Sequence, residues 1–227
     1  MLSVRLARGM PDKFTTVRRE GRFERLDRGS RFIGICRPLD EAEDAERLLD
    51  DARVLFPQAT HYVYAWRISR PVLLQRFSDD GEPQGTAGRQ VLEVLIKEGI
   101  DMAGLVVIRY FGGVKLGTGG LTRAYSQTAR GALSDALPVE FVRCHTFALS
   151  TDYAVYHQLS GRLESEGYYQ QTPVFGETVR WIVGAAADRS DTLREMIMNI
   201  SAGGASVEPT GEKWLERESF FRDSSRS

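Results

Sequence analysis

The chain has 227 residues, of which 42% are hydrophobic and 27% charged, and its formal net charge is −1. This composition is that of a folded globular protein and excludes a long disordered or fibrous chain. The near-zero net charge also excludes a global attraction to nucleic acid, so any such attraction must come from a local cluster of basic residues. The length suits two domains of roughly 100 to 150 residues each.

Cysteine and histidine are too sparse and too scattered to predict a metal site or another cofactor. Cys36 and Cys144 are far apart in the sequence, and no Cys-x-x-Cys pair accompanies the three histidines. We expect both thiols to be small buried groups in a reducing cytoplasm. The N-terminal stretch MLSVRLARGMPDKF lacks the apolar core of a signal peptide. No apolar run approaches the ~20 residues that span a bilayer, so a cytoplasmic protein is expected.

The first predicted elements follow a frayed extension that ends at about residue 12. The stretch GSRFIGICRPL, residues 29–39, has strand-forming residues and is closed by Pro38. A helix is expected to start at Asp40, because Glu43 three residues later completes a capping-box pattern. Its buried stripe is predicted from the apolar residues at helical spacing, which are Ala42, Ala45, Leu48, Leu49, Ala52 and Phe56.

The next elements alternate between strands and helices. In chain order they are strands at 61–68 and 72–77, a helix from about Ala87 to Glu98, a buried strand at 105–111 and a helix at 121–137. The stretch SRP forms the turn between the first two of these strands. Gly99 stands just past the end of the first helix, as a C-terminal glycine should. Pro138 ends the second helix.

Pro138 is also the expected boundary between two domains of an α+β protein, at 1–137 and 138–212. Beyond it the predicted elements follow the order strand, helix, strand, strand, helix, strand. This order predicts a ferredoxin-like βαββαβ domain, in which two helices cover one face of a four-stranded sheet. The polar residues 213–227 are expected to form a disordered tail.

A glycine-rich basic stretch, RYFGGVKLGTGGLTRAY, occupies residues 109–125. It lies in a window from Gly104 to Leu133 that has no Asp or Glu but contains Arg109, Lys115, Arg123 and Arg130. Five of its glycines stand just before the predicted helix, namely Gly112, Gly113, Gly117, Gly119 and Gly120. Unpaired backbone N–H groups and the positive end of the helix dipole favour an anion there. Neither nucleotide-binding glycine motif occurs, so an anion site and a plain turn with solvated arginines both stay open.

The helix that follows is predicted to present a basic face. Arg123, Gln127 and Arg130 share one side by their spacing. The opposite, buried side is predicted to carry Leu121, Tyr125, Thr128 and Ala132. If an anion binds, we expect Lys115, Arg123, Arg130 and the glycine amides to contact it. Arg109 and Tyr110 would flank it.

A second unusual stretch, FSDDGEPQGTAGR, precedes the basic one at residues 77–89. Its carboxylates, Asp79, Asp80 and Glu82, would suit a hard cation, but their spacing is not that of a known calcium loop. Clustered carboxylates more often order a loop by accepting backbone N–H bonds, with Gly81 at positive φ. We therefore favour a shaped loop, braced by ion pairs with the basic stretch, over a metal site.

Four stretches resemble the IMPACT/YigZ family of cytoplasmic proteins, and they are SRF, ATHYVYAWRI, RFSDDGEPQGTAG and VVIRYFGGVKLGTGGLTRAYSQTARGAL. The resemblance runs in the expected order from Ser30 to Leu133. In the acidic loop the family pattern marks Asp79, Asp80, Gly81, Glu82, Gly85, Thr86 and Gly88. In the basic stretch it marks Arg109, Tyr110, Gly112, Gly113, Lys115, Leu116, Gly117, Gly119, Gly120, Arg123 and Tyr125. Tyr62 and Gln84 are modest departures from it.

The resemblance implies a first domain like the second domain of small-subunit ribosomal protein five. The ferredoxin-like domain is similar to the fifth domain of elongation factor G. Eukaryotic relatives act in translational control, where they restrain a starvation-responsive kinase by competing for its activator protein. They do so through an extra N-terminal domain for which this chain has no room. The family brings no established catalytic mechanism.

The sequence is therefore compatible with three classes of function. The one we favour is a non-catalytic, translation-linked regulator that binds RNA or a ribosomal surface through the cationic glycine-rich loop and the helix N-terminus. The alternative is a magnesium-dependent enzyme on a small phosphorylated or nucleotide substrate, with Asp79, Asp80 or Glu82 as metal ligand or base. That alternative requires the carboxylates to point into a pocket shared with the basic loop. A third possibility is a protein partner in translation control.

Overall fold

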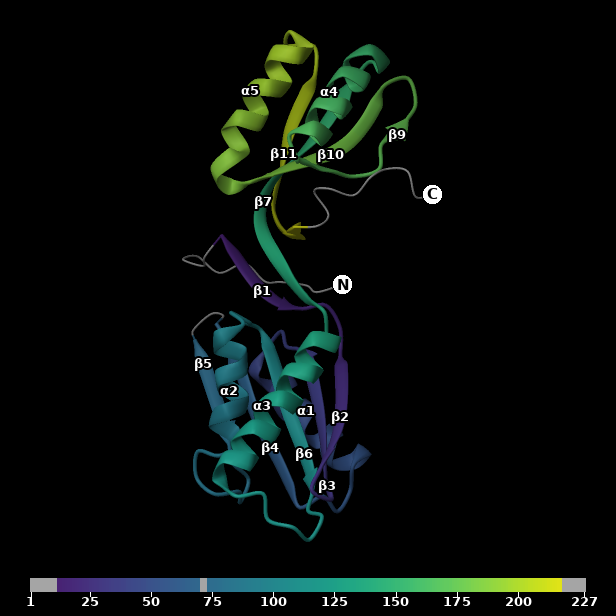
Figure 1. Ribbon diagram of the computed structural model, residues 1–227. Helices are drawn as coiled ribbons and strands as arrows, with labels where there is room; N and C mark the ends of the chain where they lie inside the picture. Colours follow the sequence, from purple (N-terminus) through teal and green to yellow (C-terminus); the bar gives the residue numbers. More distant parts are fainter. Residues whose placement is uncertain (1–11, 70–72, 218–227) are drawn as a thin grey trace. The chain divides into compact units, whose positions relative to one another are not determined.

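The structure of the protein, a computed structural model, describes residues 12–69 and 73–217 (Figure 1). The frayed extension expected before residue 12 lies outside these ranges, and so does most of the SRP turn. The tail is described only up to residue 217. Across the described ranges no helix is long and apolar enough to cross a bilayer. The described residues form two compact units, the first of residues 14–139 and the second of residues 140–217 together with Asp12 and Lys13.

The first unit is built around an antiparallel sheet. Its strands lie in the order β2-β3-β6-β4-β5, with bounds β2 Gly21–Asp27, β3 Ser30–Pro38, β6 Ala103–Tyr110, β4 His61–Ile68 and β5 Leu74–Ser78. A short strand, β1 (Lys13–Val17), precedes them, and its Thr15 bridges Ile100. The helices are α1 Ala42–Leu55, α2 Gly88–Lys97 and α3 Thr118–Asp135. β6 is therefore the central strand, paired on both sides.

Alternation of side chains along the strands separates two apolar layers, one on each face of this sheet. On one face the sheet residues Ile33, Ile35, Val106 and Ile108 meet Leu48, Leu49 and Ala52 of α1. On the other face Phe32, Cys36, Leu105 and Val107 meet α2 and α3, which lie side by side on that face in Figure 1. Because helices cover both faces, β6 is buried over almost its whole length and appears in the sequence as an unbroken apolar run.

Three local features differ from the expectation drawn from the sequence. α1 begins at Ala42, because Asp44 and not Glu43 reaches back to accept the backbone N–H groups before the helix. α3 begins at Thr118, so two of the glycines belong to its first turn. β1 and β2 carry no clear alternation and were not expected. β2 is an edge strand that is exposed along much of its length.

The second unit is likewise built around one sheet, but its helices cover only one face of that sheet. Its elements are β7 Pro138–Thr151, α4 Tyr153–Ser165, β8 Tyr169–Gln170, β9 Val174–Phe175, β10 Val179–Ala186, a short 3₁₀ turn Ala187–Arg189, α5 Ser190–Ser201 and β11 Ser206–Glu216. β7 pairs with β10 and β11, and β10 also pairs with both short pieces, β8 and β9, all antiparallel. The helices α4 and α5 pack on the same apolar layer. The protein is thus of mixed α+β class, as expected.

The C-terminal strand is longer than the sequence suggested. β11 continues to Glu216, which pairs with Phe141, so residues 213–216 lie in a strand and not in the expected tail. The reason is that β7 begins at Pro138 and offers backbone partners over this added length. Both cysteines are buried, as expected for small apolar groups, and burial raises the pKa of the Cys144 thiol to about 12.

Candidate functional site

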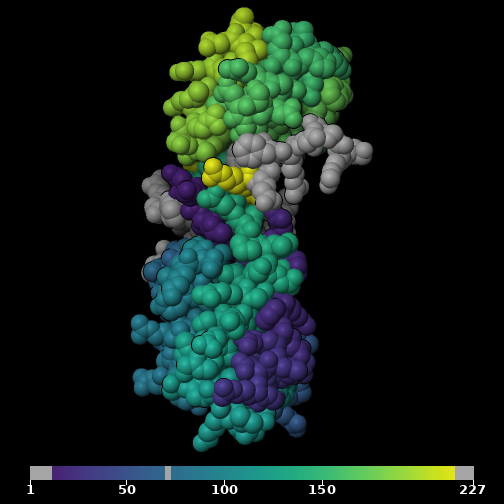
Figure 2. Space-filling view, viewed as in Figure 1, coloured from purple at the N-terminus to yellow at the C-terminus, as the bar shows by residue number. Residues whose placement is uncertain are grey.

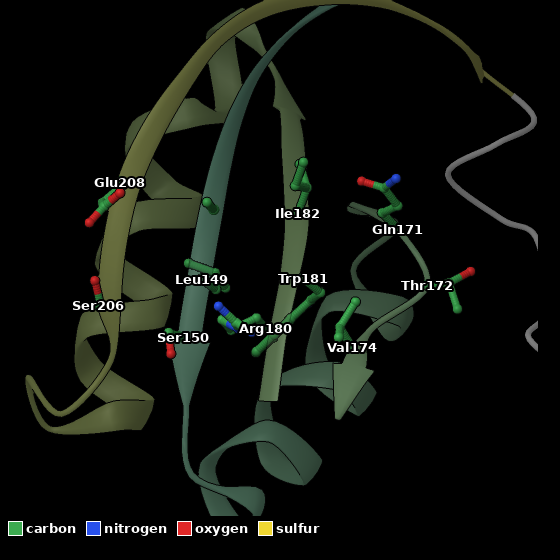
Figure 3. Close-up of a pocket in the computed structure, with 11 residues that line it drawn as sticks. Leu149, Ser150, Gln171, Thr172, Val174, Arg180, Trp181, Ile182, Ser206 and Glu208 are labelled. Carbon is green, nitrogen blue, oxygen red and sulfur yellow. The ribbon is translucent and has the colours of Figure 1, made fainter. Parts of the chain in front are cut away.

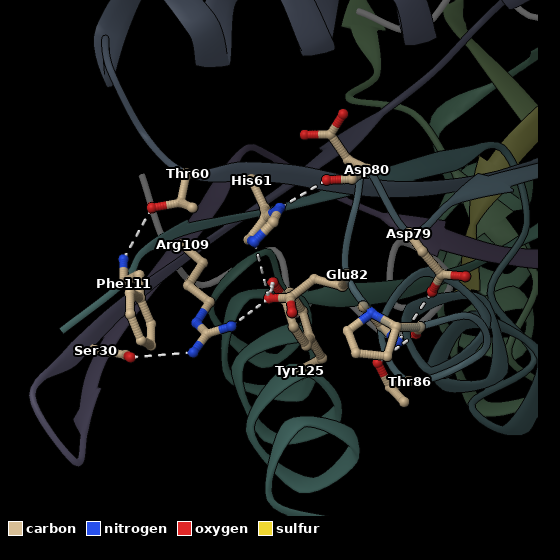
Figure 4. A network of polar contacts seen from close by, with 12 residues as sticks. Ser30, Thr60, His61, Asp79, Asp80, Glu82, Thr86, Arg109, Phe111 and Tyr125 are labelled. Atoms are coloured by element: carbon tan, nitrogen blue, oxygen red, sulfur yellow. Dashed lines mark hydrogen bonds and ion pairs between the residues drawn. The ribbon is translucent and has the colours of Figure 1, made fainter. Parts of the chain in front are cut away.

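A buried polar network in the first unit centres on the Glu82 carboxylate (Figure 4). Glu82 Oε1 accepts a hydrogen bond from Arg109 Nη1 at 2.6 Å and another from the Tyr125 hydroxyl at 2.6 Å. Burial, followed by the hydrogen bond to Glu82, raises the pKa of Tyr125, so this hydroxyl stays protonated as a donor. The network joins the acidic loop to β6 and α3, because its three members come from those three segments.

Arg109 is part of this interior and not of the surface. Only 4% of the residue is exposed, and its Nη2 donates to Ser30 Oγ at 3.3 Å. Its guanidinium carbon lies 5.4 Å from the Phe32 ring centre and 5.3 Å from that of Phe111. The sequence analysis placed Arg109 beside a bound anion. Its side chain is instead paired with Glu82. Arg109 lies on the face of β6 that α2 and α3 cover, the same face as its cross-strand neighbour Phe32 of β3.

His61 closes the network from the neighbouring strand. It pairs with Arg109 across β4 and β6, and its Nδ1 lies 2.7 Å from the Asp80 carbonyl oxygen. Because a carbonyl oxygen only accepts, Nδ1 carries the hydrogen of this bond. His61 Nε2 then lies 3.8 Å from Glu82 Oε1. The histidine thus ties the acidic loop to the sheet.

The other two carboxylates of the acidic loop bind backbone amides. Asp79 Oδ1 accepts from the N–H groups of Ala87 at 3.1 Å and Gly88 at 2.8 Å, so that it caps the start of α2. Its Oδ2 accepts from Gly85 N at 2.8 Å. Asp80 Oδ2 accepts from Tyr62 N at 2.6 Å. All three carboxylates are therefore engaged, and among the described residues no group of three His, Cys, Asp or Glu side chains is arranged to hold a metal ion.

The turn geometry of the acidic loop accounts for its remaining motif residues. Gly81 and Gly85 have φ values of 83° and 74°, which favour glycine. Thr86 Oγ1 donates to the Pro83 carbonyl oxygen at 2.6 Å and closes a tight turn. A Cβ on Gly88 would lie 2.4 Å from the Ser78 carbonyl oxygen, so only glycine fits there. Each of these features shapes the loop without a bound ligand.

Removing the Asp79 carboxylate is expected to destabilise the start of α2. In Asp79→Ala three backbone N–H groups lose their acceptor, and we expect the free energy of unfolding to fall by about 1–3 kcal/mol. Hydrogen exchange of the α2 amides measures this directly. Asp50→Ala is the matched control, because Asp50 is exposed and its one ion pair among the described residues is with Arg53; it should change stability by less than about 0.5 kcal/mol. Equal effects of the two changes would contradict the capping role.

The basic glycine-rich segment forms an open loop between β6 and α3, which we call the glycine loop, residues 111–117. It is anchored at its start, where Phe111 N donates to Thr60 Oγ1 at 3.0 Å and Gly112 N to Ser30 Oγ at 3.2 Å. Beyond these anchors almost every residue of the loop is exposed, Lys115 included. A Cβ built on Gly113 or Gly117 would meet no atom within 4 Å. The loop is thus fixed at its base and free at its tip.

The N-terminus of α3 is open to solvent in a way that the start of α2 is not. Its N-cap residue is Gly117, no side chain of the described residues accepts a hydrogen bond from its first turn, and no acidic residue lies in that turn. The first backbone N–H groups of an α-helix have no partner within the helix. At α2 the Asp79 carboxylate supplies that partner. At α3 the N–H groups and the positive end of the dipole face outward and favour an anion.

The cations beside this helix end lack acidic partners. Several exposed arginines elsewhere in the first unit pair with carboxylates, as Arg31 does with Glu24 and Arg47 with Asp44. By contrast, Lys115, Arg123 and Arg130 are exposed and form no ion pair with any described residue. On α3 the basic face that holds Arg123 and Arg130 is exposed, and the face that holds Leu121, Tyr125, Thr128 and Ala132 is buried, as predicted.

One further cation belongs to this surface and was missed in the sequence. Arg28 is exposed, forms no ion pair with a described residue, and precedes Gly29 in the turn between β2 and β3. Gly29 packs directly on Gly112 at the base of the glycine loop. Arg28 lies outside the acid-free window and has Asp27 beside it, so no local signal marked it. In the space-filling view the purple β2 segment runs beside the teal α3 (Figure 2).

Tyr110 lies on the other face of the sheet from Arg109. Its hydroxyl donates to the Pro57 carbonyl oxygen at 3.1 Å, and it packs on the apolar layer that holds α1. The structure therefore brings Lys115, Arg123 and the loop glycines together at one helix end. Arg130 lies about two turns further along α3, and Arg109 and Tyr110 serve the interior and the opposite face.

The second unit has a separate hollow on the sheet face that its helices leave open (Figure 3). Its volume is about 560 Å³, and its lining mixes polar and apolar side chains from β7, β9, β10 and β11. The charged groups there are one cation, Arg180, and one carboxylate, Glu208. This balance gives the hollow no preference for an anion, and the sequence motifs do not reach it.

Comparisons with known proteins agree with the motifs. Residues 28–133 match the Impact N-terminal domain family. IMPACT family member YvyE of Bacillus subtilis (strain 168) is 28% identical over 208 residues, which cover 92% of this chain and 96% of that protein. IMPACT family member YigZ of Escherichia coli (strain K12) is 38% identical over 134 residues, 58% of this chain and 64% of that protein.

A solved structure of a hypothetical protein is similar over both units. It covers 88% of this chain and 98% of its own, with 25% identity and a TM-score of 0.56. The matched residues 28–133 run from the turn that holds Arg28 to the end of the basic face of α3, and so include the buried network and the glycine loop. Together these matches support membership of the chain in the IMPACT family, with the Impact N-terminal domain matched at residues 28–133.

Proposed function

We propose that this protein is a translation-linked regulator that binds RNA, free or on a ribosomal surface, through the glycine loop and the N-terminus of α3. The observation that carries the proposal is the uncapped helix end beside exposed cations, Lys115 and Arg123, that have no acidic partner among the described residues. Backbone N–H groups and unpaired cations together favour phosphate oxygens. Membership in the IMPACT family supports the link to translation and a cytoplasmic location. A protein partner in translation control would share this surface.

We further propose that the two units are the domains that the family resemblance implies. The first, 1–137, would correspond to the second domain of small-subunit ribosomal protein five. The second, 138–212, would be the ferredoxin-like domain, similar to the fifth domain of elongation factor G. The pairing of β11 with β7, β7 with β10 and β10 with β8, within a sheet that also includes β1 and β9, and the two helices on one face support the second assignment.

The enzymatic alternative receives less support from the geometry. A magnesium-dependent enzyme would need carboxylates that point into a pocket beside the bound phosphate. Asp79 and Asp80 accept backbone N–H groups, and Glu82 pairs with Arg109 in the interior. The hydrogen bonds of the acidic loop serve its shape and its attachment to the sheet.

Reversing two of the exposed cations is expected to weaken RNA binding. Sedimentation of the purified protein with ribosomes and with free RNA across a salt series compares wild type with Lys115→Glu/Arg123→Glu. Wild-type binding should weaken with salt, because each phosphate contact on a single strand contributes about 0.7 to the slope of log affinity against log salt. Loss of two contacts should lower that slope by about 1.4. The variant should keep the wild-type circular dichroism spectrum, because both side chains are exposed.

The matched control is Arg53→Glu/Lys97→Glu, which makes the same change in net charge. Arg53 lies in the last turn of α1, which covers the opposite face of the sheet from α3, and Lys97 lies in the last turn of α2; both are exposed. If the two double variants lose binding equally, net charge and not the glycine loop governs it. Wild-type affinity in the Lys115/Arg123 variant would remove the proposed site.

A further inference from the structure

The glycine loop begins with an aromatic side chain that is unusually exposed. Phe111 has 46% of its surface exposed, although it directly follows the buried strand β6. Its position is fixed, because its backbone N donates to Thr60 Oγ1 at 3.0 Å (Figure 4). A phenylalanine held in solvent at this point presents a flat apolar surface, and covering that surface would be favourable.

One side of the Phe111 ring rests on a rigid cation. The Arg109 guanidinium carbon lies 5.3 Å from the ring centre, and Glu82 and Ser30 hold that guanidinium in place. No other aromatic ring contacts Phe111 among the described residues. The ring is thus supported from within the protein, and its remaining surface is free to receive a flat partner.

Two other exposed phenylalanines in the first unit, Phe23 and Phe77, have different contacts from Phe111. Phe23 covers α3, since a Cβ built on Gly131 would lie 2.3 Å from its ring. Phe77, exposed to 44%, lies on the edge strand β5 and contacts no cation among the described residues. Of these three, Phe111 alone belongs to the glycine loop, whose Lys115 forms no ion pair with a described residue.

We propose that Phe111 stacks on an unpaired nucleobase while Lys115, Arg123 and the first amides of α3 bind the adjoining phosphates. The ligand of the glycine loop is then single-stranded RNA. This inference rests on the proposed function and narrows it. In a duplex the base faces are stacked on each other, so no base face is available to Phe111. In a single strand every base offers a flat face to an aromatic ring next to a basic groove.

Fluorescence anisotropy with a labelled single-stranded RNA and with a hairpin duplex of the same composition tests the inference. Phe111→Leu should weaken single-strand binding by about 5- to 150-fold, the range for loss of one stacked base, and leave duplex binding unchanged. It should not change the salt slope, because no phosphate contact is lost. Phe111→Trp, which keeps a flat ring, should retain single-strand affinity. Phe77→Leu is the control of similar exposure and should bind as wild type.

The two levels of the proposal fail in different ways. Single-strand binding that survives in Phe111→Leu but is lost in Lys115→Glu/Arg123→Glu would overturn the stacking inference and leave the proposed function in place. Equal losses on single-stranded and duplex RNA in Phe111→Leu would also overturn it. Wild-type binding by the charge-reversed protein would overturn the proposed function itself.

Discussion

Replacing Arg109 by methionine should lower the free energy of unfolding of the first unit by about 3–5 kcal/mol. The change leaves the Glu82 carboxylate buried, with 8% of the residue exposed, and without its cationic partner. Loss of one member of a buried ion pair costs this much because an uncompensated charge stays in a low-dielectric interior. Hydrogen exchange of the β6 amides measures the loss, since those amides exchange only when the sheet opens.

Two further variants give this prediction its controls. Arg31→Met removes an equally close ion pair, with Glu24, on the exposed surface, and should cost less than about 1 kcal/mol. Arg109→Met/Glu82→Gln removes both charges and should be at least about 1 kcal/mol more stable than Arg109→Met alone. A similar cost for Arg109→Met and Arg31→Met would show that the buried pair does not hold the acidic loop.

Adding a single methyl group at Gly112 should disrupt the base of the glycine loop. A Cβ there would lie 1.9 Å from the Gly29 carbonyl carbon, and a backbone atom cannot rotate away as a side chain can. Gly112→Ala should therefore destabilise the first unit by about 1–3 kcal/mol and displace the hydrogen bond from Gly112 N to Ser30 Oγ. Thermal unfolding and RNA binding measured on the same sample should both decline.

Gly119→Ala is the matched control for this substitution. A Cβ on Gly119 would meet no atom within 4 Å, and the residue lies in the first turn of α3. Alanine there should stabilise the helix by about 0.5–1 kcal/mol, because glycine loses more backbone entropy on folding. If Gly112→Ala were as stable as Gly119→Ala, the contact between the glycine loop and the β2–β3 turn would not constrain the loop.

Local periodicity was enough to predict much of the first unit. The apolar run of β6 and the helical spacing in α3 each depend on near neighbours, so the buried side of α3 around Tyr125 was identified from the sequence. The shape of the acidic loop was also predictable, because Asp and Gly at those positions favour turns. Strand β2 was missed because it lies at the edge of the sheet and is largely exposed, so its sequence shows only a weak alternation of hydrophobic and polar residues.

The partners within the site could not be predicted in this way. Glu82 joins Arg109 and Tyr125 only after β6 and α3 have packed, and no spacing in the sequence encodes that meeting. Arg109 was expected at the surface because it shares a basic stretch with Lys115. Its side of the strand is decided by the register with β3 and β4, which a single sequence does not reveal. Arg28 approaches the glycine loop only through the packing of Gly29 on Gly112.

The position of β6 in the middle of the sheet sets the order of events during synthesis. Its neighbours β3 and β4 are both made earlier, so each leaves the ribosome with an unpaired edge. Neither can complete its pairing until residues 103–110 have emerged, and the α2 and α3 face is not covered until α3 follows. Exposed strand edges of this kind are the segments most prone to aggregate in a nascent chain. Co-translational folding of the first unit is therefore a late step, completed when α3 leaves the exit tunnel.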